Sequence, residues 1–306
     1  MAAPSVVVVG GGVIGLACAW ELRREGAEVT VLEAGAVGGG VSLGNTGWVV
    51  PSMTYPLPAP GAMREGIHQL VTRGGAFVLR PAPDPDFVRW LWRFWRSSSP
   101  ARFDAGVRAL LALNRRTLEL FDAYREAGVP FEMHATGLVI AARTDAGLEH
   151  FRRVFRRLRE LGYEGGEERE LDREELAALE PALDPASVAA GLHARVDRYV
   201  RPESLLAGLA ARLREEGARI VEGCAVSRLR PAGKEWRLDT EDGALAARRV
   251  VVAAGLAAVR LLRGLGLRAL VQPARGAVLP VAIEKDAVFE DKVAGAIGPP
   301  VDRAAR

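Results

Sequence analysis

The feature that most constrains the fold is a run of four valines, Val6–Val9, which leads directly into three glycines. A strand buried on both faces of a parallel sheet has this uninterrupted apolar composition. Gly10, Gly12 and Gly15 lie at the spacing G-x-G-x-x-G, which allows a tight turn, a close approach of backbone to a pyrophosphate, and close helix–strand packing. The sequence therefore predicts a nucleotide-binding turn made of Gly10, Gly11, Gly12, Val13, Ile14 and Gly15.

The segments after the turn complete a strand–helix–strand unit. A helix is expected over 16–25 and a second strand over 27–32, with Gly26 ending the helix. The N-terminal amides of such a helix hold phosphate oxygens. Glu33 follows the second strand close to the spacing of about 20 residues at which a carboxylate binds a ribose hydroxyl. This acid argues against a nucleotide-free α/β domain, which is the alternative, and it disfavours the 2′-phosphate of NADP.

The middle of the chain departs from a continuous nucleotide-binding domain. In place of a third strand–helix pair, a second glycine-rich loop covers 38–47 and a proline-punctuated stretch covers 51–60. Small residues in such loops let backbone lie close to an extended cofactor. Beyond them, helices and strands alternate in a pattern that we interpret as an inserted domain. The expected helices cover 62–72, 84–97, 101–127, 145–161 and 173–179, and the expected strands cover 136–142 and 188–194.

The nucleotide-binding domain is expected to resume after residue 200. Ala254 and Gly255, small residues at the end of a buried strand, permit a second close approach to a dinucleotide, and this favours FAD over NAD. The elements expected here are a helix over 202–216, a strand over 218–221, a meander over 225–229, 235–240 and 245–249, and the buried strand over 250–255.

These patterns together predict an α/β fold. An FAD-binding Rossmann-like parallel sheet with a β-meander crossover is expected to carry an inserted α+β substrate domain that is incomplete at the C-terminus. The predicted FAD-binding segments are 1–80 and 201–268. The predicted helical and substrate insertion is 81–200, and 269–306 begins a second, shortened substrate segment.

Composition argues against several other classes of protein. The formal net charge is only +3, and the arginines within 151–161 alternate with apolar residues at helical spacing, so nucleic-acid binding is not expected. Two cysteines and four scattered histidines offer neither a disulfide framework nor a metal-ligand spacing. No apolar stretch reaches the ~20 residues of a membrane span. Residues 1–20 are interpreted as strand and helix rather than a signal peptide, so we expect a cytoplasmic protein without a metal.

The second glycine-rich loop carries the most specific resemblance to a known family. Its run Ser42-Leu43-Gly44-Asn45-Thr46-Gly47, which continues to Pro51, resembles the S-x-x-N-A-G loop of the D-amino-acid oxidase-like superfamily of FAD-dependent amine oxidoreductases. Thr46 stands where the family more often has alanine. Within the superfamily, residues 5 to about 285 resemble the bacterial D-amino-acid dehydrogenases of the small-subunit type. Further landmarks similar to that family are 87–94, 180–183, 191–192, Asp197 and the turn 273–276.

The resemblance implies roles for individual residues. The turn from Gly10 to Gly15 would hold the FAD pyrophosphate, and Glu33 would bind the adenosine ribose. The other implied contacts are Ser42, Asn45 and Gly47 on the flavin side, Val226 against adenine through its backbone, and Ala254 and Gly255 over the phosphates.

The same resemblance implies oxidative deamination of D-amino acids to 2-oxo acids and ammonia. Glycine- and sarcosine-type amine oxidases are the alternative within the superfamily. No catalytic residue is assigned, and Tyr55 and Arg275 are considered only as candidate groups for the substrate carboxylate. Members of the family continue with further strands, so a C-terminally truncated chain is expected. A dinucleotide-binding remnant without turnover is therefore another alternative.

An aromatic segment, Phe87–Arg96, predicts a contact outside its own domain. On a helix its apolar residues spread over an arc of roughly 200°, whereas a core-facing helix needs a stripe only somewhat wider than about 100°. Arg89, Arg93 and Arg96 gather in the remaining sector. Tryptophan beside arginine suits a lipid headgroup interface, and the resemblance implies electron transfer to membrane quinone. Contact with the inner face of the membrane, or with a partner subunit, is therefore expected, with burial by the second domain as the alternative.

Overall fold

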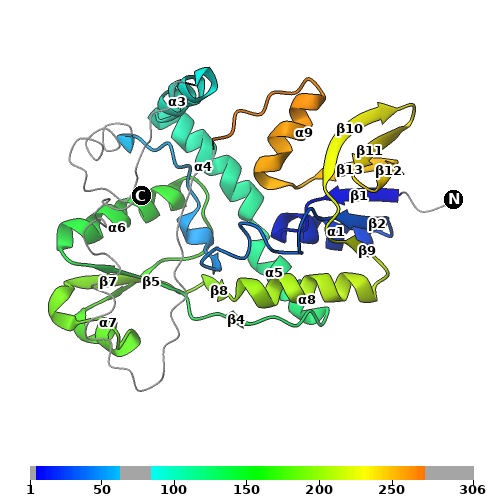
Figure 1. Ribbon diagram of the computed structural model, residues 1–306. Helices are drawn as coiled ribbons and strands as arrows, with labels where there is room; N and C mark the ends of the chain where they lie inside the picture. The colour runs from blue at the N-terminus through cyan, green and yellow to red at the C-terminus, as the bar shows by residue number, and fades with distance from the viewer. Residues whose placement is uncertain (1–4, 63–83, 273–306) are drawn as a thin grey trace, which may run out of the picture.

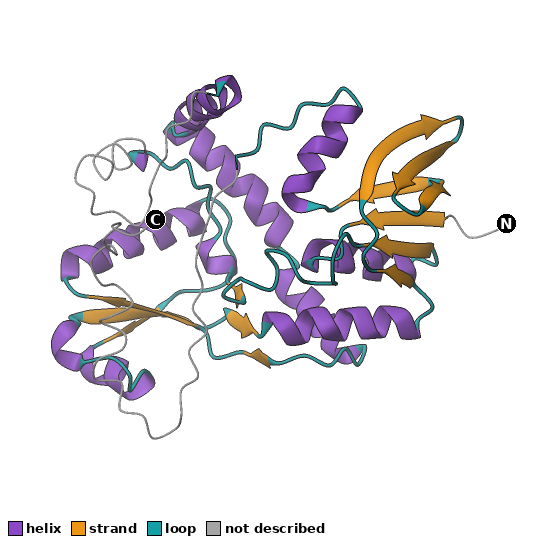
Figure 2. Ribbon diagram, viewed as in Figure 1, coloured by secondary structure: helices purple, strands orange, loops and turns teal. Residues whose placement is uncertain are grey.

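The computed structural model describes residues 5–62 and 84–272 (Figure 1). A parallel sheet and an antiparallel ribbon lie at one end of the molecule, and a smaller antiparallel sheet with its own helices lies at the other (Figure 2). The long helices α4 (Pro100–Asn114) and α8 (Pro202–Glu215) lie between these two ends.

The parallel sheet confirms the expected nucleotide-binding architecture. Its strands are β1 (Ser5–Val9), β2 (Glu28–Leu32), β9 (Arg219–Val221) and β13 (Arg249–Val252), in the order β13-β1-β2-β9. Strand β1 is central and pairs in parallel with both β2 and β13. This position buries both of its faces, which explains the uninterrupted run of valines.

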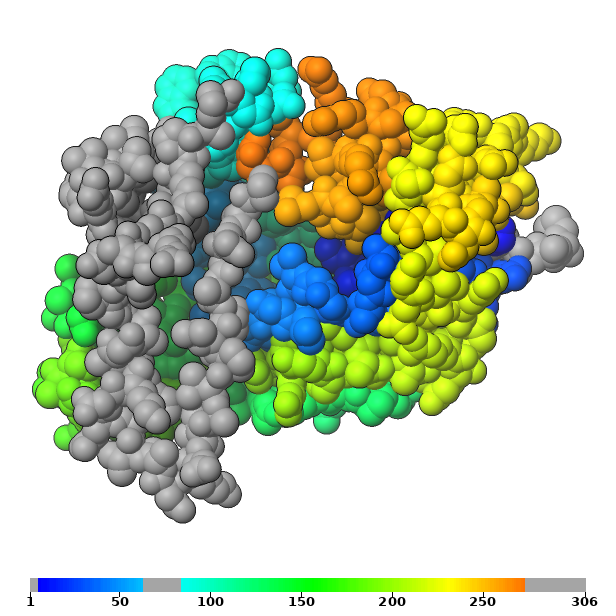
Figure 3. All heavy atoms as spheres, in the orientation of Figure 1, coloured from blue at the N-terminus to red at the C-terminus, as the bar shows by residue number. Residues whose placement is uncertain are grey.

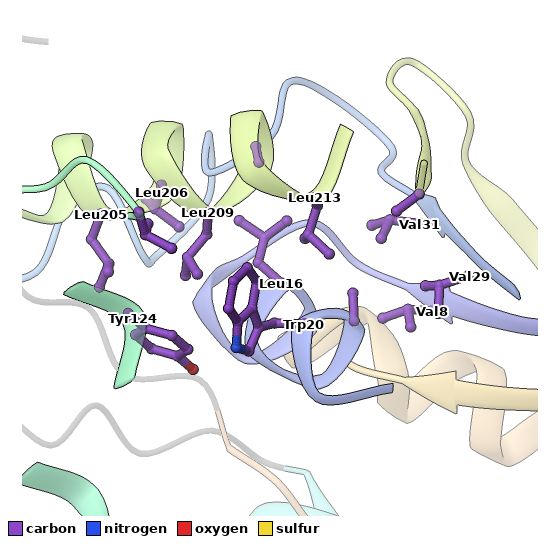
Figure 4. Close-up of a cluster of buried hydrophobic side chains, with 14 of the residues drawn as sticks. Val8, Leu16, Trp20, Val29, Val31, Tyr124, Leu205, Leu206, Leu209 and Leu213 are labelled. Atoms are coloured by element: carbon purple, nitrogen blue, oxygen red, sulfur yellow. The ribbon is translucent and has the colours of Figure 1, made fainter. Parts of the chain in front are cut away.

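Helices cover one face of the sheet. The side chains of Val6 and Val8 point to this face, where α1 (Val13–Arg24) packs beside α8. Trp20 of α1 is fully buried, and its ring meets that of Tyr124 edge-on with centroids 5.8 Å apart (Figure 4). Leu209 and Leu213 of α8 fill the remaining space over the strands, and burying each contributes roughly 1.5–3 kcal/mol.

The meander covers the opposite face of the sheet. Strands β10 (Val226–Ala232), β11 (Glu235–Thr240) and β12 (Gly243–Ala247) form an antiparallel ribbon. Val7 and Val9 of β1 pack against Leu238 of the ribbon and Leu261 of α9 (Ala258–Gly264). The meander and its place next to the parallel sheet confirm the sequence prediction.

The second unit is an α+β layer, as expected for the insertion. Strands β5 (Leu138–Ala142), β7 (Ala190–Ala194) and β6 (Arg169–Leu171) form an antiparallel sheet. It packs with α6 (Asp145–Glu160) around the fully buried ring of Phe155. The short helix α7 (Arg173–Leu179) begins at a capping box, in which Asp172 and Glu175 each bind the other's backbone.

A third small sheet lies between the two units. It consists of β3 (Trp48–Val49), β8 (Arg198–Val200) and β4 (Met133–His134), in the order β3-β8-β4. Single 3₁₀ turns follow β3 at η1 (Pro51–Met53), precede β7 at η2 (Pro185–Ser187) and follow β13 at η3 (Gly255–Ala257).

One helix that the sequence predicts as continuous is interrupted in the structure. The sequence predicted a single helix over 101–127, whereas the structure has α4 and then α5 (Thr117–Glu126). Asn114 and Thr117 flank the break, and the Thr117 hydroxyl donates to the Asn114 side-chain oxygen at 3.4 Å. Asparagine and threonine have low helix propensity, which favours a break at this point.

Other differences concern boundaries and coverage. The strand predicted over 136–142 begins at Leu138, because Gly137 has a φ of +84°. Side chains of α5 lie in the buried cluster of the parallel sheet, although the predicted insertion covers them, and the division into domains stays a prediction. The predicted helix 62–72, residue Arg275 and most of 269–306 lie outside the described residues.

Candidate cofactor site

The glycine turn between β1 and α1 has a conformation and packing that only glycine allows at two positions. Gly10 has a φ of +113°, and a Cβ there would lie 2.5 Å from the carbonyl oxygen of Ala253. A Cβ at Gly15 would lie 1.9 Å from the carbonyl oxygen of Gly10. A Cβ at Gly12 would meet only the Ser42 hydroxyl oxygen, at 3.0 Å. The fold itself therefore requires glycine at positions 10 and 15, whereas the space beside Gly12 is open to a ligand.

The N-terminus of α1 faces this turn without an acidic side chain. Gly12 is its N-cap, no side chain caps it in the usual way, and no carboxylate lies in its first turn. The Val13 amide donates a hydrogen bond to the Ser42 hydroxyl oxygen at 3.0 Å. The positive end of the helix dipole is thus available to an anion, which fits a pyrophosphate.

Glu33 stands at the end of β2 beside the turn. Its carboxylate accepts hydrogen bonds from the Gly11 amide at 2.6 Å and the Gly35 amide at 2.9 Å. Its backbone carbonyl accepts one from the Cys224 amide at 2.9 Å, which brings the start of the meander to the same edge of the sheet. A carboxylate held at the carboxyl ends of parallel strands is placed to receive ribose hydroxyls.

The other residues predicted for the adenosine and phosphate side converge on this edge. Val226 begins β10, is buried, and pairs with Thr240 of β11. The Cα of Ala254 lies 3.0 Å from where a Gly10 Cβ would stand, and Gly255 has a φ of +53°. The structure therefore brings Val226, Ala254 and Gly255 to the carboxyl edge that carries the glycine turn and Glu33.

The loop Ser42–Gly47 is built by its own side chains. The Asn45 side-chain amide donates to the Ser42 carbonyl, and its oxygen accepts from the Gly47 amide at 2.6 Å. Gly47 has a φ of +71°, and a Cβ there would lie 1.9 Å from the carbonyl oxygen of Val200. Figure 3 shows this stretch in blue on the surface between α8 in yellow-green and α9 in orange. Asn45 and Gly47 thus shape the loop where it meets β8.

A cavity of about 470 Å³ opens beside the loop. Val13 of the dinucleotide turn and Ser42, Asn45 and Gly47 of the loop line one part of it, so the cavity adjoins the glycine turn. None of the described side chains around it is charged. The rest of the lining is Trp48, Val49, Val50, Pro51, Met53, Thr54, Tyr55, Leu110, Asn114, Thr117, Phe121, Val200, Pro202, Leu205 and Leu206. An uncharged, mostly apolar cavity fits a neutral planar ring such as a flavin.

A buried carboxylate anchors one wall of this cavity. Asp197 is completely buried between β7 and β8 and accepts hydrogen bonds from the hydroxyl and the amide of Ser52. Burial raises the pKa of Asp197 above its ordinary value, and the Ser52 hydrogen bonds oppose this rise. Because Ser52 lies within η1, Asp197 ties the cavity-lining turn to the α+β layer.

Sequence reasoning missed several of these residues as site residues. Of the two candidate groups for the substrate carboxylate, Tyr55 lines the cavity and Arg275 lies outside the described residues. Thr54, Asn114 and Thr117 also line the cavity but carried no signal, since isolated threonines and asparagines have no motif. No group of histidine, cysteine, aspartate or glutamate suited to a metal ion occurs within 5–62 or 84–272.

Comparison with known proteins identifies the family. A sequence profile described as "FAD dependent oxidoreductase" matches residues 5–303. The chain is 30% identical over 289 residues to a D-amino acid dehydrogenase of Phenylobacterium zucineum, covering 92% of this chain and 67% of that one. It is 31% identical to a D-amino acid dehydrogenase of Cereibacter sphaeroides, covering 91% of this chain and 64% of that one.

A solved structure shares the fold. Glycine oxidase from Geobacillus kaustophilus superposes with a TM-score of 0.59 at 25% identity, covering 86% of this chain and 58% of that chain. The chain therefore spans about two thirds of the curated relatives and less than two thirds of this structural neighbour. The profile match extends over the glycine turn, the loop and the meander, and the chain belongs to the FAD dependent oxidoreductase family.

Proposed function

We propose that the protein oxidatively deaminates D-amino acids to 2-oxo acids and ammonia with FAD. The uncharged cavity that adjoins the dinucleotide turn carries this proposal, because it places a ring-sized apolar space next to an anion-binding helix end. The relatives named D-amino acid dehydrogenase supply the substrate class.

The proposed cofactor contacts follow from the site. The turn Gly10–Gly15 and the N-terminus of α1 hold the pyrophosphate, Glu33 binds the adenosine ribose, and Val226 contacts adenine through its backbone. Ala254 and Gly255 close over the phosphates. The flavin lies in the cavity lined by Ser42, Asn45 and Gly47.

The chain's own residues orient the cofactor and the substrate and surround them with apolar side chains. Bound FAD supplies the two-electron acceptor that takes a hydride from the amino-acid Cα, after which water converts the imino acid to the 2-oxo acid and ammonia. Apolar side chains of β3 and α8 line the cavity. The Tyr55 hydroxyl, which lines the cavity, is the candidate donor to the substrate carboxylate.

A dye-coupled assay of the purified protein tests the proposal. We expect reduction of an artificial electron acceptor with small neutral D-amino acids and little with their L-enantiomers. Tyr55→Phe should raise KM more than it lowers kcat if the hydroxyl binds the carboxylate. Bound FAD without turnover on any amino acid would refute the activity.

A glycine- or sarcosine-type amine oxidase is the second candidate. The likeness to glycine oxidase from Geobacillus kaustophilus favours it. The same assay separates the two, because turnover confined to glycine and sarcosine, with oxygen as acceptor, would select this alternative.

We also propose that α3 (Pro85–Ser97) lies against the anionic inner face of a membrane, and that quinone in this membrane accepts the electrons from the protein. None of its side chains is buried, and Trp92 and Trp95 are 50% and 59% exposed. The Arg96 guanidinium lies 4.7 Å from the centre of the Trp92 ring. Within the described residues, no helix is long and apolar enough to cross a membrane. An exposed surface of tryptophan and arginine supports peripheral contact.

A basic hollow beside α3 supports the same contact. It has a volume of about 300 Å³, and Arg93, Arg96 and Arg102 line it together with Trp92 and Ser97. No described carboxylate forms an ion pair with any of these three arginines, in contrast to Arg89, which pairs with Asp86 at 2.9 Å. Guanidinium groups without a carboxylate partner among the described residues suit the phosphate of an anionic phospholipid.

Co-sedimentation with vesicles tests the membrane contact. The protein should bind vesicles rich in phosphatidylglycerol more than phosphatidylcholine vesicles, and the double variant W92S/W95S should lose this binding while it stays folded. Leu179→Ser, at an exposed leucine of α7, is the matched control. Unchanged binding by W92S/W95S would reject the contact.

A further inference from the structure

A chain of hydrogen bonds reaches the cavity from the break between α4 and α5. The Asn114 amide nitrogen donates to the hydroxyl oxygen of Thr54 at 2.6 Å, and the Thr117 hydroxyl donates to the Asn114 amide oxygen at 3.4 Å. All three side chains line the cavity. They come from two distant stretches of the chain, since Thr54 and Asn114 are separated by 60 residues.

In the structure each bond of this chain is donated in the direction of Thr54. Thr117 uses its proton on Asn114, and Asn114 uses an N–H on Thr54. Thr54 accepts that bond, so its own O–H proton points elsewhere, and among the described residues it has no acceptor. Thr54 is only 7% exposed. A buried hydroxyl whose proton has no acceptor is costly, and the cavity is where an acceptor can be supplied.

Ser42 and Asn45, on the loop side of the cavity, are part-exposed or exposed and differ from Thr54, which is buried. Ser42 accepts from the Val13 amide, and Asn45 bonds within the loop through both its nitrogen and its oxygen. Among the hydroxyl-bearing residues that line the cavity, Thr54 is the buried one, whereas Ser42, Tyr55 and Thr117 are part-exposed. A buried, placed donor in a mostly apolar cavity helps to fix the orientation of a bound ring.

We propose that Thr54 donates a hydrogen bond to an acceptor atom of the neutral ring bound in this cavity, and that Asn114 and Thr117 are positioning residues that aim its proton. The inference rests on the proposed binding of FAD here. Polarisation along the chain strengthens the terminal donor.

Three single-residue variants of the protein test whether Thr54 donates to the bound ring. Thr54→Val removes the donor, and Thr54→Ser keeps it. Asn114→Asp replaces the donating N–H by a carboxylate that takes the Thr54 proton for itself. Quenching of flavin fluorescence measures FAD affinity, the visible spectrum of bound flavin reports hydrogen bonding to the ring, and thermal unfolding of the apo-protein reports a purely structural effect.

We expect Thr54→Val to weaken FAD binding about fivefold to tenfold, which is the loss of one hydrogen bond, and to shift the visible bands of bound flavin. Thr54→Ser should restore the affinity to within about twofold of wild type. Asn114→Asp should match Thr54→Val and add nothing further in the double variant, because both withdraw the same proton.

Three results would overturn the inference. Either the affinity and the spectrum stay unchanged in Thr54→Val and Asn114→Asp, or the two effects add independently in the double variant. A fall in apo-protein stability with an unshifted flavin spectrum shows a structural role only and also overturns it. If the wild-type protein binds no FAD, the proposed cofactor site fails and the inference falls with it.

Discussion

Gly12 and Gly15 are three residues apart in one turn, yet alanine at Gly15 should destabilise the fold, whereas alanine at Gly12 should weaken cofactor binding. At Gly15 a Cβ would stand 1.9 Å from the Gly10 carbonyl oxygen, so strand and helix must separate. Overpacking of this kind costs about 1–3 kcal/mol or more, and the gain in helix propensity returns only about 1 kcal/mol. Gly15→Ala should therefore destabilise the fold itself.

At Gly12 the backbone has a φ of −77° and a ψ of 178°, which alanine adopts without strain. The added Cβ would meet only the Ser42 hydroxyl oxygen at 3.0 Å. Replacing an N-cap glycine by alanine costs at most about 1 kcal/mol. Gly12→Ala should thus fold nearly as well as wild type, while its methyl group fills the space into which the pyrophosphate is proposed to fit.

Thermal unfolding of the apo-protein and titration with FAD separate these effects. For a chain of this size, each 1 kcal/mol shifts Tm by about 2–4 °C, so Gly15→Ala should lower Tm by several degrees. Gly12→Ala should lose most FAD affinity with little change in Tm. The reasoning is refuted if Gly12→Ala binds FAD as wild type does, or if Gly15→Ala unfolds at the wild-type temperature.

Three further substitutions follow from contacts of the site. Burial raises the pKa of Asp197 above the ordinary value of 3.8, so its ionisation opposes folding; this cost is absent below that pH and grows as pH rises toward the folded pKa. Asp197→Asn should therefore gain stability relative to wild type between pH 3.5 and pH 7 in urea titrations, and a constant difference across that range would contradict the sign. Ser42→Ala removes the acceptor of the Val13 amide and should cost about 1 kcal/mol in the same titrations, whereas no loss would show that this bond contributes nothing. Gly47→Ala should reduce the yield of folded protein measured by circular dichroism, because its φ is +71° and Val200 blocks the Cβ; normal yield would refute the strain.

Local patterns were sufficient to predict the nucleotide-binding half of the fold. The valines of β1, the three glycines and Glu33 act within a single strand–helix–strand unit, so spacing alone predicted their arrangement. The meander was also predicted, since its strands alternate and are separated by short turns. Edges of elements shifted by one or two residues where a glycine such as Gly137 adopts a positive φ.

The rest depends on contacts between distant residues. Strands β3, β4, β6 and β8 have only two or three residues each, too few for a periodic pattern. The hydrogen bond that joins Asn114, at the break between α4 and α5, to Thr54 spans 60 residues. The pairing of Ser52 with Asp197 spans 145 residues and likewise leaves no mark in either local sequence.

The most direct test of the cofactor site is the identity of what the purified protein releases on denaturation. The account predicts a yellow protein that releases FAD in a ratio near one per chain, and a colourless protein when Gly12 is replaced by valine. Release of a nicotinamide dinucleotide in place of flavin, or full retention of FAD by Gly12→Val, would contradict it.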